Sequence, residues 1–163
     1  MTVHIRITSI VAWFAVVTTL IIIRISYNIP DEAIREWPIL QIYATCLVAA
    51  LILVAVIADI AHSDTSNWTG ILLLTSWSTS VILQFTRIYS AFGVESAAGS
   101  LDRSVTTAHY FSIVTWTILG YGDFHPIEKL RLFASFEALL GYAAMAVIAG
   151  IVVVIITKKM IKS

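Results

Sequence analysis

The chain has 163 residues, of which 59% are hydrophobic and only 12% are charged. A soluble domain of this size could not bury so much apolar surface, so a lipid bilayer is the expected solvent. Lys and Arg balance Asp and Glu at 10 each, which argues against nucleic acid as a partner, and the single Cys46 excludes a disulfide framework within the chain.

Apolar segments of sufficient length predict four transmembrane helices. A bilayer core of about 30 Å needs roughly 20 helical residues, and the segments that qualify are 8–28, 39–60, 68–91 and 131–157. The first is expected to be a retained span, because its apolar run is long for a signal peptide and no small-x-small cleavage site precedes Arg24. We divide the chain into residues 1–62, two helices of unknown role, and residues 63–163. An even number of crossings places both termini on one side.

Residues 104–117 form a shorter, moderately apolar stretch that is expected to be a re-entrant half-helix, capped by Ser104 or Thr106. It leads directly into the sequence TILGYGD, residues 117–123. Irregular backbone at membrane depth is tolerated only where protein or a water-filled cavity surrounds it. This loop is therefore predicted to line an aqueous path.

The two glycines of this loop suit an ion-binding ribbon. Moving a bare monovalent ion into a low dielectric costs on the order of 20 kcal/mol by the idealised Born estimate, so a pore must replace the hydration shell with oxygens. Backbone carbonyls can do so if the dihedral angles alternate in handedness, and Gly120 and Gly122 can adopt positive φ without steric cost. The end of the preceding half-helix adds a dipole contribution.

The stretch YFSIVTWTILGYGDFHP resembles the pore helix and selectivity filter of the potassium-channel superfamily, whose filter has a T-x-G-Y-G core. The later stretch FEALLGYAAMAVIAG resembles the inner helix of prokaryotic two-helix channels. The resemblance covers about residues 68–157. It implies an all-α membrane protein in which four transmembrane helices, a re-entrant pore helix and a filter loop assemble as a homotetramer.

This resemblance assigns the outer helix to 68–91, the pore helix to 104–117, the filter to 117–123 and the inner helix to 131–157. It implies passive conduction of K⁺ across the cell membrane, with the filter facing outside and both termini cytoplasmic. No enzyme motif and no cofactor are expected, and the partners are lipid and further copies of the chain. The residues expected to form the ion path are Thr117, Ile118, Leu119, Gly120, Tyr121 and Gly122, with K⁺ held at Thr117, Leu119, Gly120 and Tyr121.

Neighbouring residues receive supporting roles from the same resemblance. Asp123 would lie behind the filter and accept a hydrogen bond from Tyr110 or Trp116. The ring of Tyr121 would pack into an aromatic cuff that consists of Tyr110, Phe111 and Trp116. In the inner helix, Gly141 is a candidate gating hinge, and Glu137 is expected to form a hydrogen bond with the pore helix or a neighbouring subunit.

Ile118 departs from the family pattern, because the family usually has a threonine there whose hydroxyl helps to form the innermost ion site. A hydrocarbon side chain offers no oxygen, so this site is expected to be weakened or absent. Two alternatives therefore stay open: a weakly selective or near-silent cation channel, and a non-conducting membrane scaffold or regulatory subunit that keeps the pore fold.

Three other residues carry expectations from their positions. Arg24 and Arg87 lie near the ends of their spans and are expected to extend towards lipid headgroups. Arg24 alone could not give steep voltage dependence, at about 2.3 kcal/mol per charge per 100 mV. His125 follows the filter and is expected to be an exposed turn residue, with external proton sensing as the alternative.

Overall fold

The computed structural model describes Val17, Ile21, Arg24, residues 27–36, residues 49–50, Val54 and residues 67–161. The expected spans at 8–28 and 39–60, and the division at residue 62, lie mostly outside these residues. The elements in chain order are α2 (Asp31–Arg35), α4 (Asn67–Phe92), β1 (Val94–Ser96), β2 (Leu101–Asp102), α5 (Val105–Trp116), β3 (Phe124–Pro126), the 3-10 helix η1 (Glu128–Leu130) and α6 (Arg131–Ile161).

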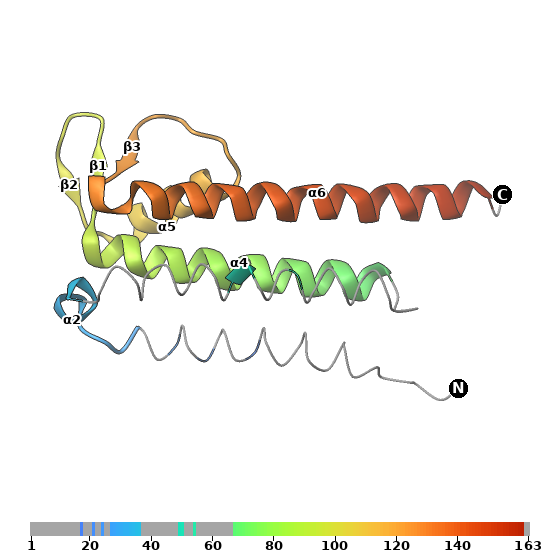
Figure 1. The fold of residues 1–163 in the computed structure, drawn as a ribbon, viewed down its shortest axis with the longest axis horizontal. Coiled ribbons are helices and arrows are strands. Elements are labelled where there is room, and N and C mark those ends of the chain that lie inside the picture. Colours follow the sequence, from blue (N-terminus) through green and yellow to red (C-terminus); the bar gives the residue numbers. More distant parts are fainter. Residues whose placement is uncertain are drawn as a thin grey trace.

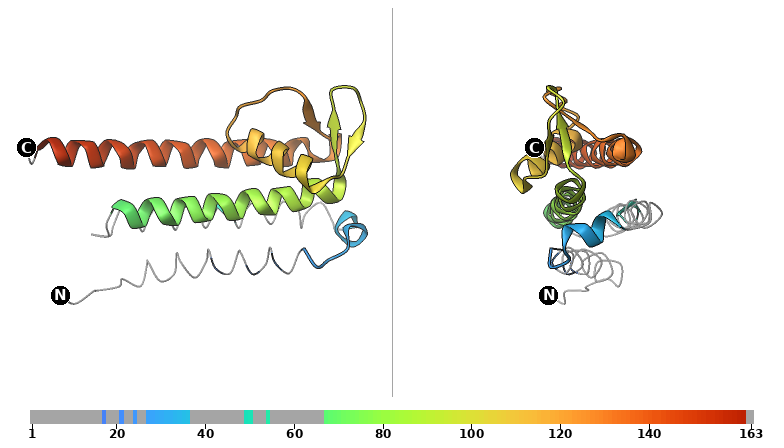
Figure 2. Two further views of the ribbon diagram at one scale, coloured as in Figure 1. Left: turned by 180° about the vertical axis from the view of Figure 1, so that it is seen from behind. Right: turned by 90° about the vertical axis from the view of Figure 1, so that its left-hand side faces the viewer.

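The two long helices run antiparallel, and the short helix α5 packs against both of them (Figure 1). Seen end-on, α4, α5 and α6 occupy the corners of a triangle (Figure 2). Helix α5 starts at the end of the molecule that carries the strands and points inward, and the chain then returns through residues 117–123 to β3 at the same end. The stretch is therefore re-entrant, because it enters and leaves at one end.

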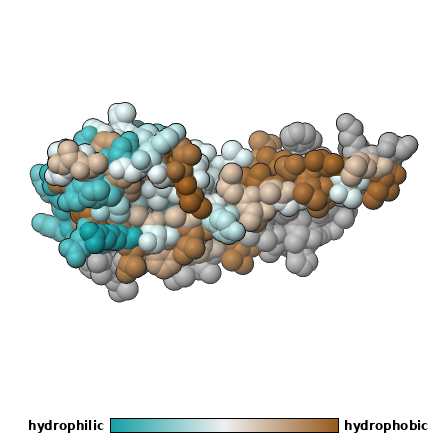
Figure 3. Space-filling model, turned by 90° about the horizontal axis from the view of Figure 1, so that it is seen from above, coloured by the Kyte–Doolittle hydropathy of each residue, from teal (hydrophilic) through white to brown (hydrophobic). Residues whose placement is uncertain are grey.

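Helix α6 has the composition of a membrane span. Among the described residues, one helical segment, Glu128–Val154, is long and apolar enough to cross a bilayer. On the face that Figure 3 shows, polar side chains gather at the end with the strands, and apolar side chains predominate among the described residues farther from the sheet. Helix α4 has a similar length, at 26 residues, and is less apolar because hydroxyl residues occupy its middle. Exposed apolar side chains on the last turns of α6 include Val152, Val153, Val154, Ile156, Met160 and Ile161.

Aromatic side chains form the core where the three helices meet. Phe85 of α4 stacks on Phe133 of α6 with ring centroids 4.3 Å apart, and Tyr89 meets Phe111 of α5 edge-on at 4.9 Å. Trp77, one of the fully buried residues, lies 5.5 Å from the ring of Trp116. Such pairs add to the free energy gained by burying their area, so they fix α5 firmly against α4.

A small antiparallel sheet, in the strand order β2-β1-β3, was not expected in an all-α protein. Val94 pairs with Asp102 on one side and with Pro126 on the other. Strands of two or three residues carry too little alternation to be detected in a sequence, which explains why the sequence predicted no strand here. Because β3 directly follows the loop 117–123, the sheet fixes the point at which the re-entrant segment ends.

The start of α5 is fixed by a group of side-chain caps. The Ser104 hydroxyl accepts a hydrogen bond from the backbone N–H of Thr107 (3.2 Å), so Ser104 is the N-cap. Asp102 accepts bonds from the Ser104 N–H (2.7 Å) and from the Thr107 hydroxyl (2.6 Å). These hydrogen bonds, the one from Thr107 above all, lower the pKa of Asp102 below its ordinary value.

Arg87 corrects an expectation from the sequence, because it does not extend towards lipid headgroups. It is buried in α4 and donates hydrogen bonds to the Asp31 carboxylate (2.6 Å) and to the Ile29 carbonyl (2.5 Å). Arg35 of α2 donates to the Ala91 carbonyl at 3.0 Å. A buried guanidinium requires such partners, and they come from the start of α2 and the residue Ile29 before it, 56 and 58 residues away in the sequence. The contacts attach α2 to the end of α4.

Gly141 lies where α6 approaches the backbone of α5 most closely. A Cβ atom built at this position would lie 2.0 Å from the carbonyl oxygen of Trp116. Helix α6 continues through Gly141 without a break. In this conformation the glycine provides room for a close contact, and the hinge role expected from the resemblance stays a prediction.

The substitution Gly141→Ala is expected to destabilise the protein, because the added methyl group collides with backbone that cannot rotate away. Overpacking of this kind costs about 1–3 kcal/mol. Gly150→Ala is the matched control, since it lies in the same helix with open space around it, and it should gain up to about 1 kcal/mol from helix propensity. Thermal unfolding in detergent would measure the stability of both variants. An equal change in melting temperature for the two variants would contradict the close contact at Gly141.

The cap on α5 predicts a dependence of stability on pH. The pKa of Asp102 is lower in the folded protein, so its hydrogen bonds stabilise the fold above its unfolded pKa of about 3.9, and this contribution is lost as the pH falls through the folded value. We expect the melting temperature of the wild type to fall more steeply than that of Asp102→Asn between about pH 5 and pH 2. Parallel curves of melting temperature against pH for the two proteins would show that the hydrogen bonds of Asp102 do not stabilise the fold.

Candidate functional site

The backbone of the loop after α5 alternates in handedness. Positive φ angles occur at Ile118 (57°), Gly120 (56°) and Gly122 (80°), and neither Leu119 nor Tyr121 between them has one. This alternation is the geometry that turns successive carbonyl groups towards one side. The glycines adopt it freely, whereas a β-branched residue at positive φ is an outlier with a strain of about 1–3 kcal/mol.

The carbonyl oxygens of residues 117–122 have no hydrogen-bond donor in the part of the chain that the structure describes. The first N–H groups of the loop do find partners, since those of Thr117, Ile118 and Leu119 donate to carbonyls in the last turn of α5. Residues 117–123 are all exposed in the single chain. Six consecutive acceptors are thus available to a ligand.

Asp123 anchors the end of the loop. Its carboxylate accepts hydrogen bonds from the Tyr110 hydroxyl (2.7 Å) and from the Phe124 N–H (3.2 Å). Its carbonyl accepts a bond from the N–H of Ala97, in the turn between β1 and β2, at 2.8 Å. Of the two donors expected for Asp123, Tyr110 makes the bond and Trp116 lies against Trp77. Contacts with α5 and with the turn of the sheet therefore fix the position of this end of the loop.

Within one chain, Tyr110 is the member of the expected aromatic cuff that contacts Tyr121. The Tyr121 ring stacks on Tyr110 with centroids 6.4 Å apart and planes 4° apart. Phe111 and Trp116 instead face α4, where Tyr89 and Trp77 cover them. The resemblance assigned them to the cuff, and the sequence could not show which face of α5 would meet α4. The side of Tyr121 away from Tyr110 is open, since the residue is 66% exposed.

Thr117 directly follows the last residue of α5 as its C-cap and is the first residue of the loop. Its hydroxyl donates to the Ile113 carbonyl, one turn back, at 2.8 Å. The hydroxyl proton is therefore used within the helix, while the Thr117 carbonyl is among the unbonded acceptors. The next residue, Ile118, exposes 56% of its surface and presents only carbon from its side chain.

Glu137 lies behind α5 and is fully buried, at 0% exposure. It accepts a hydrogen bond from the Tyr89 hydroxyl of α4 at 2.8 Å and forms a short hydrogen bond with the Ser112 hydroxyl of α5. The sequence predicted a contact of Glu137 either with the pore helix or with a neighbouring subunit, and the contact with Ser112 lies in α5, the expected pore helix. Tyr89 was missed, although a tyrosine in an apolar helix is a signal that a buried polar partner is needed.

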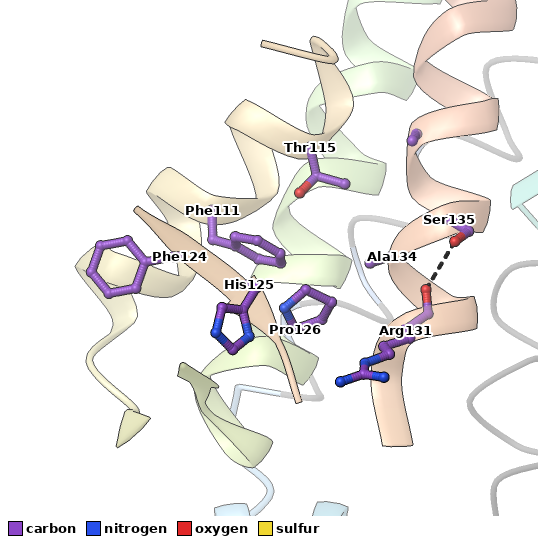
Figure 4. A pocket seen from close by; sticks show the side chains of 9 residues that line it. Phe111, Thr115, Phe124, His125, Pro126, Arg131, Ala134 and Ser135 are labelled. Atoms are coloured by element: carbon purple, nitrogen blue, oxygen red, sulfur yellow. Dashed lines mark hydrogen bonds between the residues drawn. The ribbon is translucent and has the colours of Figure 1, made fainter. Parts of the chain in front are cut away.

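A groove of about 650 Å³ separates α5 and β3 from the start of α6 (Figure 4). Phe111 and Thr115 line one side, and Ala134 and Ser135 line the other. His125 lies at its rim in strand β3 rather than in a turn, and its Nδ1 is 3.3 Å from a carboxylate oxygen of Glu95. No group of three or more metal-ligating side chains occurs among the residues described.

Comparisons with known proteins agree with this architecture. A family described as "Ion channel" matches residues 71–158, from α4 to near the end of α6. The chain is also similar to the "Voltage-gated potassium channel Kch" of Escherichia coli (strain K12), with 31% identity over 102 residues. That match covers 62% of this chain and 24% of the relative, so this chain spans only a small part of the relative's length. No solved structure matches the chain.

The family match covers more than half of the chain and contains α5, the loop 117–123 and α6 in full apart from the last turn. The potassium-channel-type pore domain predicted from the sequence is thereby confirmed. The chain belongs to the ion channel family.

Proposed function

We propose that this protein is a potassium-selective channel that conducts K⁺ passively through a pore lined by the carbonyls of residues 117–122. The observation that carries the proposal is the run of six exposed carbonyl oxygens that have no donor among the described residues, on a backbone of alternating handedness. Such carbonyls replace the hydration shell of an ion without a charged side chain. The printed name of the similar E. coli protein supports potassium as the ion.

Four copies around one axis would complete the site. A single loop supplies one carbonyl at each level, which is too few oxygens to replace the water around an ion. Leu119 and Tyr121 expose 55% and 66% of their surface in one chain. Packing of neighbouring copies against these side chains would cover them and close each ring of carbonyls. In this arrangement the protein is a multi-pass protein of the cell membrane, with the filter outside and both termini cytoplasmic.

Ile118 supports a second candidate function, a weakly selective or near-silent cation channel. Its side chain points no oxygen at an ion, and four copies would place four hydrocarbon groups at the inner end of the filter. An ion there would lack part of its shell, at a cost of about 1–3 kcal/mol for each unmade polar contact. The sites at Leu119, Gly120 and Tyr121 use backbone carbonyls and do not depend on this side chain.

Flux measurements on Ile118→Thr would separate these functions. The purified protein is reconstituted in liposomes, and K⁺ and Na⁺ fluxes are recorded under separate gradients. We expect the wild type to pass K⁺ and not Na⁺, and the threonine variant to raise K⁺ flux by about tenfold or more, because a hydroxyl replaces a missing ion contact. Ile113→Thr, the same change in the preceding helix, is the matched control and should leave both fluxes unchanged.

Comparable K⁺ and Na⁺ fluxes in the wild type would favour the weakly selective channel. A wild type that is silent until threonine is introduced would show that the residue at 118 disables an intact pore. Stable tetramers that pass neither ion, with either residue at 118, would overturn the channel proposal and favour a membrane scaffold.

A further inference from the structure

The buried carboxyl group of Glu137 joins the three helices that surround it. It lies in α6, and its two hydroxyl partners are Tyr89 of α4 and Ser112 of α5. The Ser112 oxygen also lies 3.1 Å from the carbonyl oxygen of Ile82, again in α4. All of the side chains involved are buried, with Tyr89, Ser112 and Glu137 each at 0% exposure.

The direction of these hydrogen bonds depends on the charge of Glu137. Tyr89 donates to one carboxyl oxygen in either case. The Ser112 hydroxyl has one proton and two acceptors within reach, the Ile82 carbonyl and the other carboxyl oxygen. A neutral Glu137 donates to Ser112, which then donates to Ile82, so that all three contacts contain a proton. An ionised Glu137 would accept the hydrogen bond of the Ser112 hydroxyl, which would leave the contact between Ser112 and Ile82 without a proton.

Burial favours the neutral form as well. An ionised carboxylate away from water costs several kcal/mol unless a cation or several donors compensate. The polar contacts of this carboxyl in the described part of the chain are two neutral hydroxyl groups. Tyr89 is the other titratable group that faces it, and a phenol does not supply a positive charge.

Position makes this contact relevant to the loop. Glu137 meets Ser112, and one helical turn further along both helices Gly141 meets the Trp116 carbonyl. Helices α5 and α6 are therefore in register over two successive turns. The second contact directly precedes Thr117, the first residue of the loop whose carbonyls are unbonded. A shift of α5 against α6 would move the start of this loop.

We propose that Glu137 is a positioning residue, present as a neutral carboxylic acid, which fixes the pore helix against the inner and outer helices and thereby sets the geometry of the filter. This role rests on the proposed potassium conduction, but the protonation state and the contact between the helices do not.

Infrared spectroscopy on the protein in lipid tests the protonation state. A neutral carboxylic acid in an apolar site has a carbonyl-stretch band that a carboxylate lacks. We expect this band in the wild type at neutral pH and expect it to disappear in Glu137→Gln. Glu128→Gln is the matched control, because Glu128 is exposed in η1, and it should keep the band. A wild type without the band, or a band that survives in Glu137→Gln, would overturn the neutral form.

Flux measurements test the positioning role. Glu137→Gln should retain the preference for K⁺ over Na⁺, because its amide can donate to Ser112 and accept from Tyr89 as the neutral acid does. Glu137→Leu removes both contacts at a similar size, and we expect the K⁺ preference to fall by about tenfold, as for the loss of one buried hydrogen bond. Equal selectivity in the wild type and Glu137→Leu would overturn the role, as would an equal loss in both variants.

Melting temperatures separate this inference from the proposed function. If the wild type passes no K⁺, the conduction proposal fails, while the contact between the helices is tested by heating the tetramers in detergent. A lower melting temperature for Glu137→Leu than for Glu137→Gln supports the contact. Identical melting temperatures in all three proteins would overturn it.

Discussion

An unbonded backbone carbonyl cannot face lipid, and this constraint determines the rest of the structure. Each such group left without a partner in hydrocarbon costs several kcal/mol. Residues 117–122 present six of them in succession without a donor in the described part of the chain. A backbone of this kind can persist within a membrane only if water or ions reach the oxygens and if protein excludes lipid around them. The helices and the sheet provide the frame, and in the proposed assembly further copies of the chain would complete the enclosure.

Helix α5 carries the loop, so its position has to be fixed along its whole length. Asp102 and Ser104 bond its first turn, Glu137 contacts its middle at Ser112, and Gly141 packs against the carbonyl of its last residue. The far end of the loop is held separately by the bonds to Asp123. The two contacts with α6 lie one helical turn apart, so their contributions to stability should be coupled, whereas those of the caps at the first turn should add to them independently. Together they can hold a strained loop in one conformation.

The sequence predicted the parts of the site that depend on local chemistry. The glycine spacing in TILGYGD indicated the alternating ribbon, because only glycine adopts positive φ without strain, and the short apolar stretch before it indicated the half-helix. The features that the sequence did not predict depend on contacts between residues far apart in the chain. Arg87 is buried because Asp31, at the start of α2, and Ile29 reach it from a distant part of the sequence. Phe111 and Trp116 turn towards α4. In an almost uniformly apolar helix, no pattern distinguishes the side that faces protein from the side that faces lipid. The strands are too short to show any period.

Ile118 combines the backbone strain and the altered chemistry of the filter in one residue. Its φ of 57° is unfavourable for a β-branched side chain. The threonine usual in the family is also β-branched, so it would meet a similar steric penalty at this φ. The strain therefore belongs to the ribbon and not to the choice of isoleucine. Isoleucine lacks the side-chain oxygen of threonine. In the proposed filter the backbone geometry would therefore be kept while the innermost ion site would lose its side-chain ligands. A pore of this kind would differ from its relatives at one ion site, with its frame and its carbonyl sites unchanged.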